Sequence, residues 1–149
     1  MFKIQKATRQ DYQSIAVSLR NKAIPYITPE QADRDIENGN LYIIKENGKP
    51  IAQCALVYET DHHYHAIKRL VVYNKKNRGR GIANAFICHF VNFNLPALGC
   101  TPWEDNIVMR NLLENYGFEF KYKFLEKYCS YVLTNCDCCD IINSLKERN

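Results

Sequence analysis

The stretch Arg78-Gly79-Arg80-Gly81-Ile82-Ala83 decides the fold of this chain. It follows a β-rich run over residues 66–73 and opens an apolar helical pattern that continues to about residue 93. Glycines allow backbone torsions that a Cβ would forbid, and they let a ligand approach closely. The helix that follows presents unpaired N–H groups and its positive dipole end. The stretch therefore predicts a binding site for an anion, and phosphate is the usual occupant.

Length and composition indicate one globular domain. The chain has 149 residues, of which 46% are apolar and 24% charged, and its net charge of +4 is too mild to argue for nucleic acid. No apolar run approaches the roughly 18 residues that span a bilayer. The N-terminal residues lack the apolar core of a signal peptide. We therefore expect a cytoplasmic protein with neither nucleic acid nor a membrane as partner.

Seven cysteines are many for this length, but the number is odd and there is no export signal, so reduced thiols are expected. Cys136, Cys138 and Cys139 crowd together near the C-terminus, whereas a structural zinc site needs two separated pairs. The histidines within residues 62–65 lack a carboxylate or thiol at metal-ligand spacing. We expect no metal. Residues 1–134 should form the domain and residues 135–149 a Cys-rich polar tail.

Turn and periodicity signals predict the elements of the first half. An alternating strand over residues 2–6 precedes a capping box at residues 8–11 and an apolar helical stripe over residues 12–19. Thr28-Pro29 opens a second helix, which Gly39 ends. Asn47-Gly48 separates two β-rich runs and is a strong hairpin signal. With the strand that ends near residue 73, these runs make three consecutive antiparallel strands.

The second half continues with an apolar helical stripe over residues 82–93, closed by Pro96, and a short strand at residues 97–101. Asp105 or Asn106 caps a last helix, which Gly117 ends. Two strands within residues 118–133 form a closing hairpin. The order β-α-α-β-β-β-α-β-α-β-β predicts an α/β fold, a mixed, mostly antiparallel sheet of about seven strands with about four helices on its faces.

This order, with these residues at the strand-to-helix junction, resembles the GCN5-related N-acetyltransferase (GNAT) superfamily over about residues 2–133. The family's central motif is Arg or Gln, two residues, Gly, one residue, then Gly or Ala, and here it stands as Arg78-Gly79-Arg80-Gly81-Ile82-Ala83. Leu70-Val71-Val72 matches the family's fourth strand. Asn106, followed by Leu112-Leu113-Glu114-Asn115-Tyr116-Gly117-Phe118, resembles its second cofactor-contacting segment. The match is nearest to small stand-alone, bacterial-type members whose fourth strand starts like Tyr64-His65-Ala66-Ile67.

The resemblance implies a GNAT fold, in which a β-bulge splays the fourth strand from the fifth, and it implies acetyl-CoA as cosubstrate. The backbone N–H groups of residues 79–83 would hold the pyrophosphate, with both arginine side chains toward solvent near the phosphates. The strand backbone would pair with the pantetheine arm, and one of its N–H groups would polarise the thioester carbonyl. The implied cofactor-binding residues are Leu70, Val71, Val72, Arg78, Gly79, Arg80, Gly81, Ile82, Ala83 and Asn106.

The implied activity is that of an N-acetyltransferase (EC 2.3.1.-), in which a primary amine of a small molecule or peptide attacks the thioester directly in a ternary complex. The reaction needs a base for the ammonium and an acid for the leaving thiolate. The family's usual acid is a Tyr at the position of Leu113, and Tyr116 is the nearest phenol. His65, Glu104 and Asp105 stay open as bases. No catalytic residue is therefore assigned.

Three alternatives accompany this interpretation. Leu113, in place of the usual Tyr, is compatible with a non-catalytic module that binds CoA or an acyl-CoA and senses or regulates. A dinucleotide site is disfavoured because the glycine pattern is not Gly-x-Gly-x-x-Gly and the preceding strands form hairpins. Only the tail cysteines favour a thiol or metal protein. The family's frequent dimers also leave a homodimer open.

Overall fold

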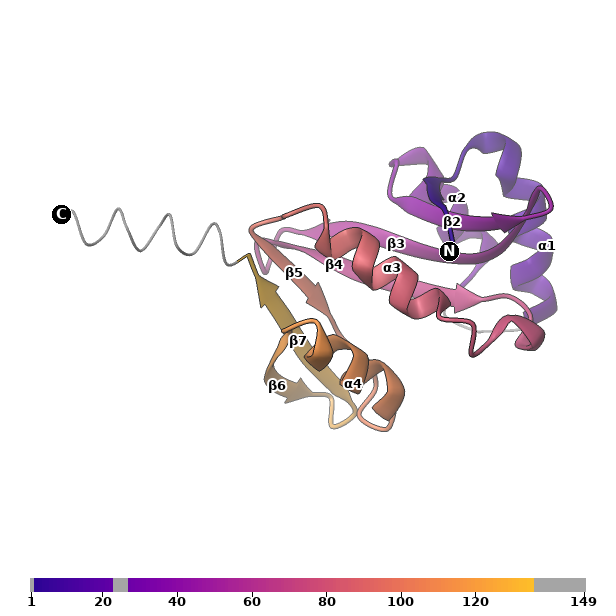
Figure 1. Cartoon of the computed structure of the whole chain (residues 1–149). Coiled ribbons are helices and arrows are strands. Elements are labelled where there is room, and N and C mark those ends of the chain that lie inside the picture. Colours follow the sequence, from indigo (N-terminus) through magenta and orange to yellow (C-terminus); the bar gives the residue numbers. More distant parts are fainter. Residues whose placement is uncertain (1, 23–26, 136–149) are drawn as a thin grey trace. The chain divides into compact units, whose positions relative to one another are not determined.

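The structure is a computed structural model that describes residues 2–22 and 27–135. Its elements follow the predicted order (Figure 1). Their bounds are β1 (Ile4–Lys6), α1 (Tyr12–Lys22), α2 (Pro29–Glu37), β2 (Leu41–Glu46), β3 (Lys49–Glu59), β4 (Tyr64–Val72), α3 (Ile82–Val91), β5 (Ala97–Cys100), α4 (Ile107–Asn115), β6 (Glu119–Phe124) and β7 (Tyr128–Thr134). Short 3-10 turns add Arg9–Asp11 and Lys75–Asn77. The tail cysteines at 136, 138 and 139 lie outside the described residues.

The predicted mixed α/β sheet is confirmed. Its seven strands are hydrogen-bonded in the order β1-β2-β3-β4-β5-β7-β6. The β4–β5 pair is parallel, while β1–β2, β2–β3, β5–β7 and β6–β7 are antiparallel. The chain divides into two compact units, Met1–Val57 with Lys68–His89 and Tyr58–Ile67 with Phe90–Asn149, so β4 contributes to both.

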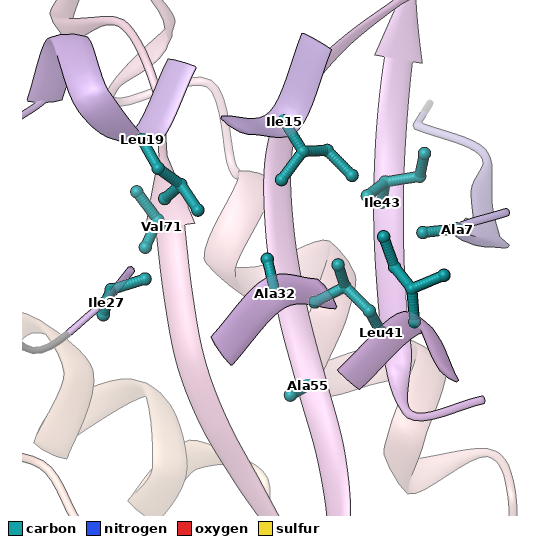
Figure 2. Packing of buried hydrophobic residues seen from close by; sticks show 10 residues of the cluster. Ala7, Ile15, Leu19, Ile27, Ala32, Leu41, Ile43, Ala55 and Val71 are labelled. Atoms are coloured by element: carbon teal, nitrogen blue, oxygen red, sulfur yellow. The ribbon is translucent and has the colours of Figure 1, made fainter. Parts of the chain in front are cut away.

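The first unit buries an apolar cluster between α1, α2 and one face of β2, β3 and β4 (Figure 2). Its members are Ala7, Ile15, Leu19, Ile27, Ala32, Ile36, Leu41, Ile43, Ala55 and Val71. Tyr42 and Ile44 alternate with them along β2 and are buried on its other face, where the Tyr42 ring contacts that of His89 in α3. Because both faces of β2 are covered, its first four residues form a continuous apolar run.

Local capping explains where the elements of this unit begin and end. The Thr8 backbone N–H donates to the Asp11 carboxylate at 2.8 Å, which confirms the predicted capping box. The Thr28 hydroxyl accepts from the Gln31 N–H at 3.1 Å and caps α2. Asn47-Gly48 adopts φ values of 55° and 78°, as a tight hairpin turn between β2 and β3 requires.

The second unit combines the start of β4 with β5, β7, β6 and α4. The side chains of Leu113 in α4 and Tyr131 in β7 are fully buried. The predicted end of α4 is confirmed, because Gly117 has φ 91° and the Phe118 N–H donates to the Leu113 carbonyl at 3.0 Å. No helix within residues 2–22 and 27–135 is long and apolar enough to cross a membrane.

The predicted end of the third helix is wrong in one respect. The helix ends at Val91, and Asn94 takes a left-handed φ of 55°, before Pro96 is reached. The Phe93 side chain, expected on the buried stripe, is 38% exposed. Asparagine tolerates this conformation better than other non-glycine residues, so it ends the helix without proline.

Candidate functional site

The predicted phosphate loop forms an open turn at the N-terminus of α3. Gly79 and Gly81 have φ values of 77° and 82°, in the region that glycine adopts readily. A Cβ built on either residue has no atom within 4 Å, so the backbone faces open space on that side. The Gly81 carbonyl accepts from the Ala85 N–H at 3.0 Å and starts the helix. This open backbone fits the close approach of a phosphate-bearing group.

A short turn that the sequence did not predict joins β4 to this loop. The Asn74 side chain accepts from the Lys76 N–H at 3.0 Å, and the Arg78 N–H donates to the Lys75 carbonyl at 3.1 Å. The 3-10 turn Lys75–Asn77 thus leads from the end of β4 into the glycine loop. Asparagine's habit of bonding the backbone two residues ahead was the available signal.

The charge of Arg80 is already engaged within the protein. One guanidinium nitrogen lies 2.5 Å from the Glu46 carboxylate, and another donates to the Asn77 side chain at 2.7 Å. The guanidinium also lies over the Phe2 ring, 5.1 Å from its centroid. The hydrogen bond with Glu46 raises the pKa of Arg80 and lowers the pKa of the glutamate. Arg78 is exposed as well.

A left-handed residue interrupts β4 directly before the predicted cofactor strand. Arg69 has φ 54°, and its side chain forms a two-point ion pair with the buried Asp35 of α2. The Arg69 carbonyl accepts from the Gln53 amide at 3.5 Å, and the Tyr73 hydroxyl donates to the same amide at 2.6 Å. Burial raises the pKa of the Tyr73 phenol. Two neighbouring elements, α2 and β3, therefore hold the bend.

The pairing of β4 with β5 ends just before this bend. The parallel register runs from His65 opposite Leu98 to Ile67 opposite Cys100, and residues 68–72 continue past it. Val71 is buried in the core beside Leu19 and Ile27 (Figure 2). Leu70 and Val72 are only partly buried, as expected where alternate side chains of a strand point to opposite faces. The Val71 side chain serves packing, so a cofactor contact of this residue would have to use its backbone.

The structure brings most of the predicted site residues into one unit. Residues 70–72 and 78–83 lie in the first unit, while Asn106 lies in the second. The Asn106 side chain accepts from the Met109 N–H at 3.2 Å and caps α4. The helix-capping role is thereby confirmed, and the pantetheine contact stays a prediction.

Of the groups considered for proton transfer, His65 and Glu104 have other partners, and Asp105 is exposed. Leu113, at the position expected to hold a Tyr, is fully buried. Tyr116 ends α4 and lines an apolar groove of about 250 Å³. The His65 ring lies edge-on to Tyr58 at 5.1 Å, and the Glu104 carboxylate is 3.3 Å from the Lys123 ammonium. No catalytic acid or base is assigned from these positions.

The buried Tyr131 has a role that the sequence does not predict. The Tyr131 hydroxyl accepts from Arg110 Nε and donates to the Glu114 carboxylate, each at 3.1 Å. Both partners lie on α4, so this network fastens the helix to β7. The contact joins residues about 20 positions apart, and no local sequence signal marks it.

Three of the four cysteines in the described residues are buried, and Cys88 is partly buried. Cys54, Cys100 and Cys129 are buried, and burial raises the pKa of the Cys100 thiol to about 12. Within residues 2–22 and 27–135, no three His, Cys, Asp or Glu side chains gather as metal ligands would. The buried thiols are therefore shielded from solution reagents at neutral pH.

The fold can be compared with known proteins. No protein-family model matches the sequence, and no curated protein matches it. Solved structures do. A GNAT-family acetyltransferase from Streptococcus agalactiae superimposes with a TM-score of 0.73 at 18% identity, covering 89% of this chain and 95% of its own. The chain has the GNAT fold.

Two further structures with this fold have named substrates. The ribosomal-protein-S18-alanine N-acetyltransferase of Escherichia coli gives a TM-score of 0.72 at 15% identity and covers 91% of this chain and 94% of its own. The spermidine N-acetyltransferase of Vibrio cholerae, solved with CoA and spermine, gives 0.71 at 14% identity, with coverages of 91% and 96%. The GNAT resemblance stated from the sequence is thus confirmed at the level of the fold.

Proposed function

We propose that this chain is a cytoplasmic N-acetyltransferase that transfers an acetyl group from acetyl-CoA to a primary amine of a small molecule or peptide. Residues 1–134 would act as the acetyltransferase domain. The observation that carries the proposal is the pair of left-handed glycines, Gly79 and Gly81, between β4 and the N-terminus of α3 in a GNAT fold. Their open backbone suits the pyrophosphate of CoA.

The remaining predicted residues have defined parts in this proposal. The backbone of residues 70–72 would pair with the pantetheine arm, and Asn106 would hydrogen-bond it. Arg78 is exposed and would add positive charge near the phosphates. The amine nitrogen forms a bond to the thioester carbonyl carbon, the C–S bond breaks, and the CoA thiolate leaves. The ammonium proton passes to a base and the thiolate takes a proton, through water or a side chain.

Binding at the loop is tested with two substitutions at Gly81. Acetyl-CoA at about 100 times its Kd should stabilise the parent protein by roughly 2.7 kcal/mol and raise its melting temperature. Gly81→Ala and Gly81→Glu both place a Cβ at φ 82°, so they share the backbone cost. Only the glutamate adds bulk and negative charge. We expect Gly81→Glu to abolish the thermal shift and Gly81→Ala to keep part of it; an unchanged shift in a folded Gly81→Glu protein would contradict the assignment.

Turnover is tested separately by mass spectrometry. The protein is incubated with acetyl-CoA and with spermine, spermidine, aminoglycosides, amino acids or short peptides with free N-termini, and products 42 Da heavier than the amine are sought, about the mass of an added acetyl group. Because the chain has seven cysteines, a thiol-dye assay would report its own thiols. Transfer to any amine supports the enzyme.

A second function is favoured by one residue. Leu113 is fully buried where the GNAT resemblance places a Tyr acid. A protein that binds acetyl-CoA tightly and acetylates no amine would instead be an acyl-CoA-binding module. The melting shift and the product assay together separate the two functions.

A further inference from the structure

Two aromatic rings in the second unit form a right-angled corner. Trp103, in the loop between β5 and α4, makes an antiparallel bridge with Tyr128 at the start of β7. Their ring centroids are 6.1 Å apart and their planes meet at 86°. Two backbone hydrogen bonds flank the bridge, from the Glu104 N–H to the Lys127 carbonyl at 2.7 Å and from the Cys129 N–H to the Pro102 carbonyl at 2.9 Å. The corner is therefore held by backbone.

An ammonium group already occupies this corner. Lys127 Nζ lies 5.6 Å from the centroid of the Trp103 ring and 5.3 Å from that of Tyr128. Both distances are within the range of cation–π attraction. The rings thus present two negative faces to one cation, an arrangement that attracts ammonium groups.

The turn that carries Lys127 is strained. Leu125 and Glu126 have φ values of 50° and 57°, and the Lys127 N–H closes the turn on the Phe124 carbonyl. Such a turn normally uses Asn-Gly or Asp-Gly, and non-glycine residues in this conformation are unfavourable. This unfavourable turn positions the Lys127 ammonium against the two rings.

The aromatic surface extends beyond the corner and is open. The Phe124 ring stacks on Tyr128 with centroids 5.2 Å apart, and Tyr122 lies 5.9 Å beyond Phe124. Trp103 is 44% exposed and Tyr122 47%. Side chains alternate along β7, so Tyr128 and Ser130 share one face and Tyr131 lies on the other. The Tyr131 hydroxyl donates to Glu114 of α4 on that other face. A flexible aliphatic chain could lie along these rings.

We infer that the Trp103–Tyr128 corner binds the primary ammonium group of a linear aliphatic amine. In the absence of this ligand, the Lys127 ammonium occupies the corner, and the ligand displaces it on binding. The neighbouring Glu104 carboxylate is engaged by Lys123 at 3.3 Å, so the ring faces supply the attraction. The ligand exchanges with a resident ammonium, and the parent protein should therefore bind weakly. That the bound amine is the acetyl acceptor rests on the proposed function.

The chain provides its own reporter for this site. Trp103 is the only tryptophan in the sequence, so fluorescence excited at a wavelength that tryptophan absorbs and tyrosine does not reports on the corner alone. The parent protein is titrated with 1,4-diaminobutane and with spermine at constant ionic strength and without CoA, and 1-butanol serves as the uncharged control. We expect a saturable change with the amines and none with the alcohol. An equal response to 1-butanol would overturn the site. The absence of a saturable response to either amine in Lys127→Gln, which lacks the lysine charge, would also overturn it.

Matched variants identify the groups responsible. Lys127→Gln keeps a side chain of similar length without the charge and should lower the Kd for the amine at least about fivefold, because nothing competes. Tyr128→Leu should raise the Kd at least about fivefold, while Tyr128→Phe keeps the ring face and should stay within about twofold. Circular dichroism checks that each variant is folded. An unchanged Kd in Lys127→Gln would contradict the inference. Because Lys127 is exposed in a turn, this substitution leaves the core intact.

The outcome is separable from that of the proposed function. A protein that acetylates amines but gives no amine-dependent fluorescence change refutes the corner and leaves the activity. A saturable fluorescence change without acetyl transfer supports the corner as an alkylammonium site and refutes only its role for an acceptor.

Discussion

The Arg69 guanidinium donates two hydrogen bonds, from Nε and Nη2, to the two oxygens of the Asp35 carboxylate, each 2.8 Å long. The Asp35 side chain is only 3% exposed. Arg69 has a left-handed φ in the middle of β4, which for a non-glycine residue costs about 1–2 kcal/mol. The planar two-point pair fixes this conformation. It ties α2 to the bend that immediately precedes the proposed cofactor strand at residues 70–72.

Breaking this pair should destabilise the protein strongly. Removing one partner of a buried ion pair leaves the other charge uncompensated, so we expect Asp35→Asn to lower the free energy of unfolding by about 3 kcal/mol. Arg69→Lys keeps the charge but loses the fork geometry, and it should recover only part of that stability. Urea unfolding at neutral pH measures both. A loss under about 1 kcal/mol in Asp35→Asn would show that the pair is not needed.

The backbone contribution of Arg69 can be isolated with two small residues. Arg69→Ala and Arg69→Gly both abandon Asp35, but only glycine adopts φ 54° without strain. The glycine variant should therefore be about 1 kcal/mol more stable than the alanine variant, reversing the usual order within a strand. Equal stabilities in urea would mean that β4 loses its bend once the ion pair is gone.

Gly99 in β5 is required by a single ring. A Cβ at this position would lie 2.6 Å from Cε1 of the Tyr64 ring. Such overpacking typically costs about 1–3 kcal/mol, which is the loss we expect for Gly99→Ala in thermal or urea unfolding. In a Tyr64→Ala background the same change should be nearly neutral, whereas Tyr64→Phe keeps the clashing atom and should give no relief. A double-mutant cycle without coupling would exclude this explanation.

Acid should weaken the N-terminal capping box. Burial raises the pKa of Asp11, but the Lys45 ammonium at 2.7 Å and the Thr8 backbone N–H more than offset it and lower the pKa below its usual value. A carboxyl with a lowered folded-state pKa contributes stability above its unfolded pKa of about 3.9 and loses it as the pH falls further. The free energy of unfolding should therefore drop more between about pH 4 and pH 2 in the parent than in Asp11→Asn. Identical pH profiles would argue against this linkage.

The Glu46–Arg80 contact should weaken the binding of anions at the glycine loop. Glu46→Gln removes the carboxylate that engages Arg80 and leaves the guanidinium charge available beside the glycine loop. Both side chains are substantially exposed, so the unfolding midpoint should hardly change. Calorimetric titration with CoA should show binding tightened about two- to fivefold, with the gain reduced at high salt. Weaker binding in Glu46→Gln would indicate that the pair orders the loop instead.

Local signals account for most of the fold that could be predicted. Thr8 with Asp11, Thr28 before Pro29, and Asn47-Gly48 each satisfy backbone groups within a few residues, so their positions are evident in the sequence. The end of α3 was misplaced because Asn94, a permissive residue, ends the helix before the stronger signal of Pro96.

In the candidate site too, local sequence signals predict some features and miss others. The glycine loop was predictable because its torsions depend on the residues themselves. The carboxylate partners of Arg69 and Arg80 each lie 34 positions away, and Trp103 meets Tyr128 through a bridge between distant segments. Nothing in the sequence near these residues indicates their partners.

By itself, the sequence determined the order of the elements, their caps and the glycine junction, because apolar periodicity and backbone torsion are properties of neighbouring residues. Only the tertiary structure decided that Asp35 holds Arg69 in a left-handed conformation, that Glu46 engages Arg80, and that Lys127 lies against two rings. Those interactions depend on short-range contacts between atoms of remote segments, and folding alone brings such atoms together.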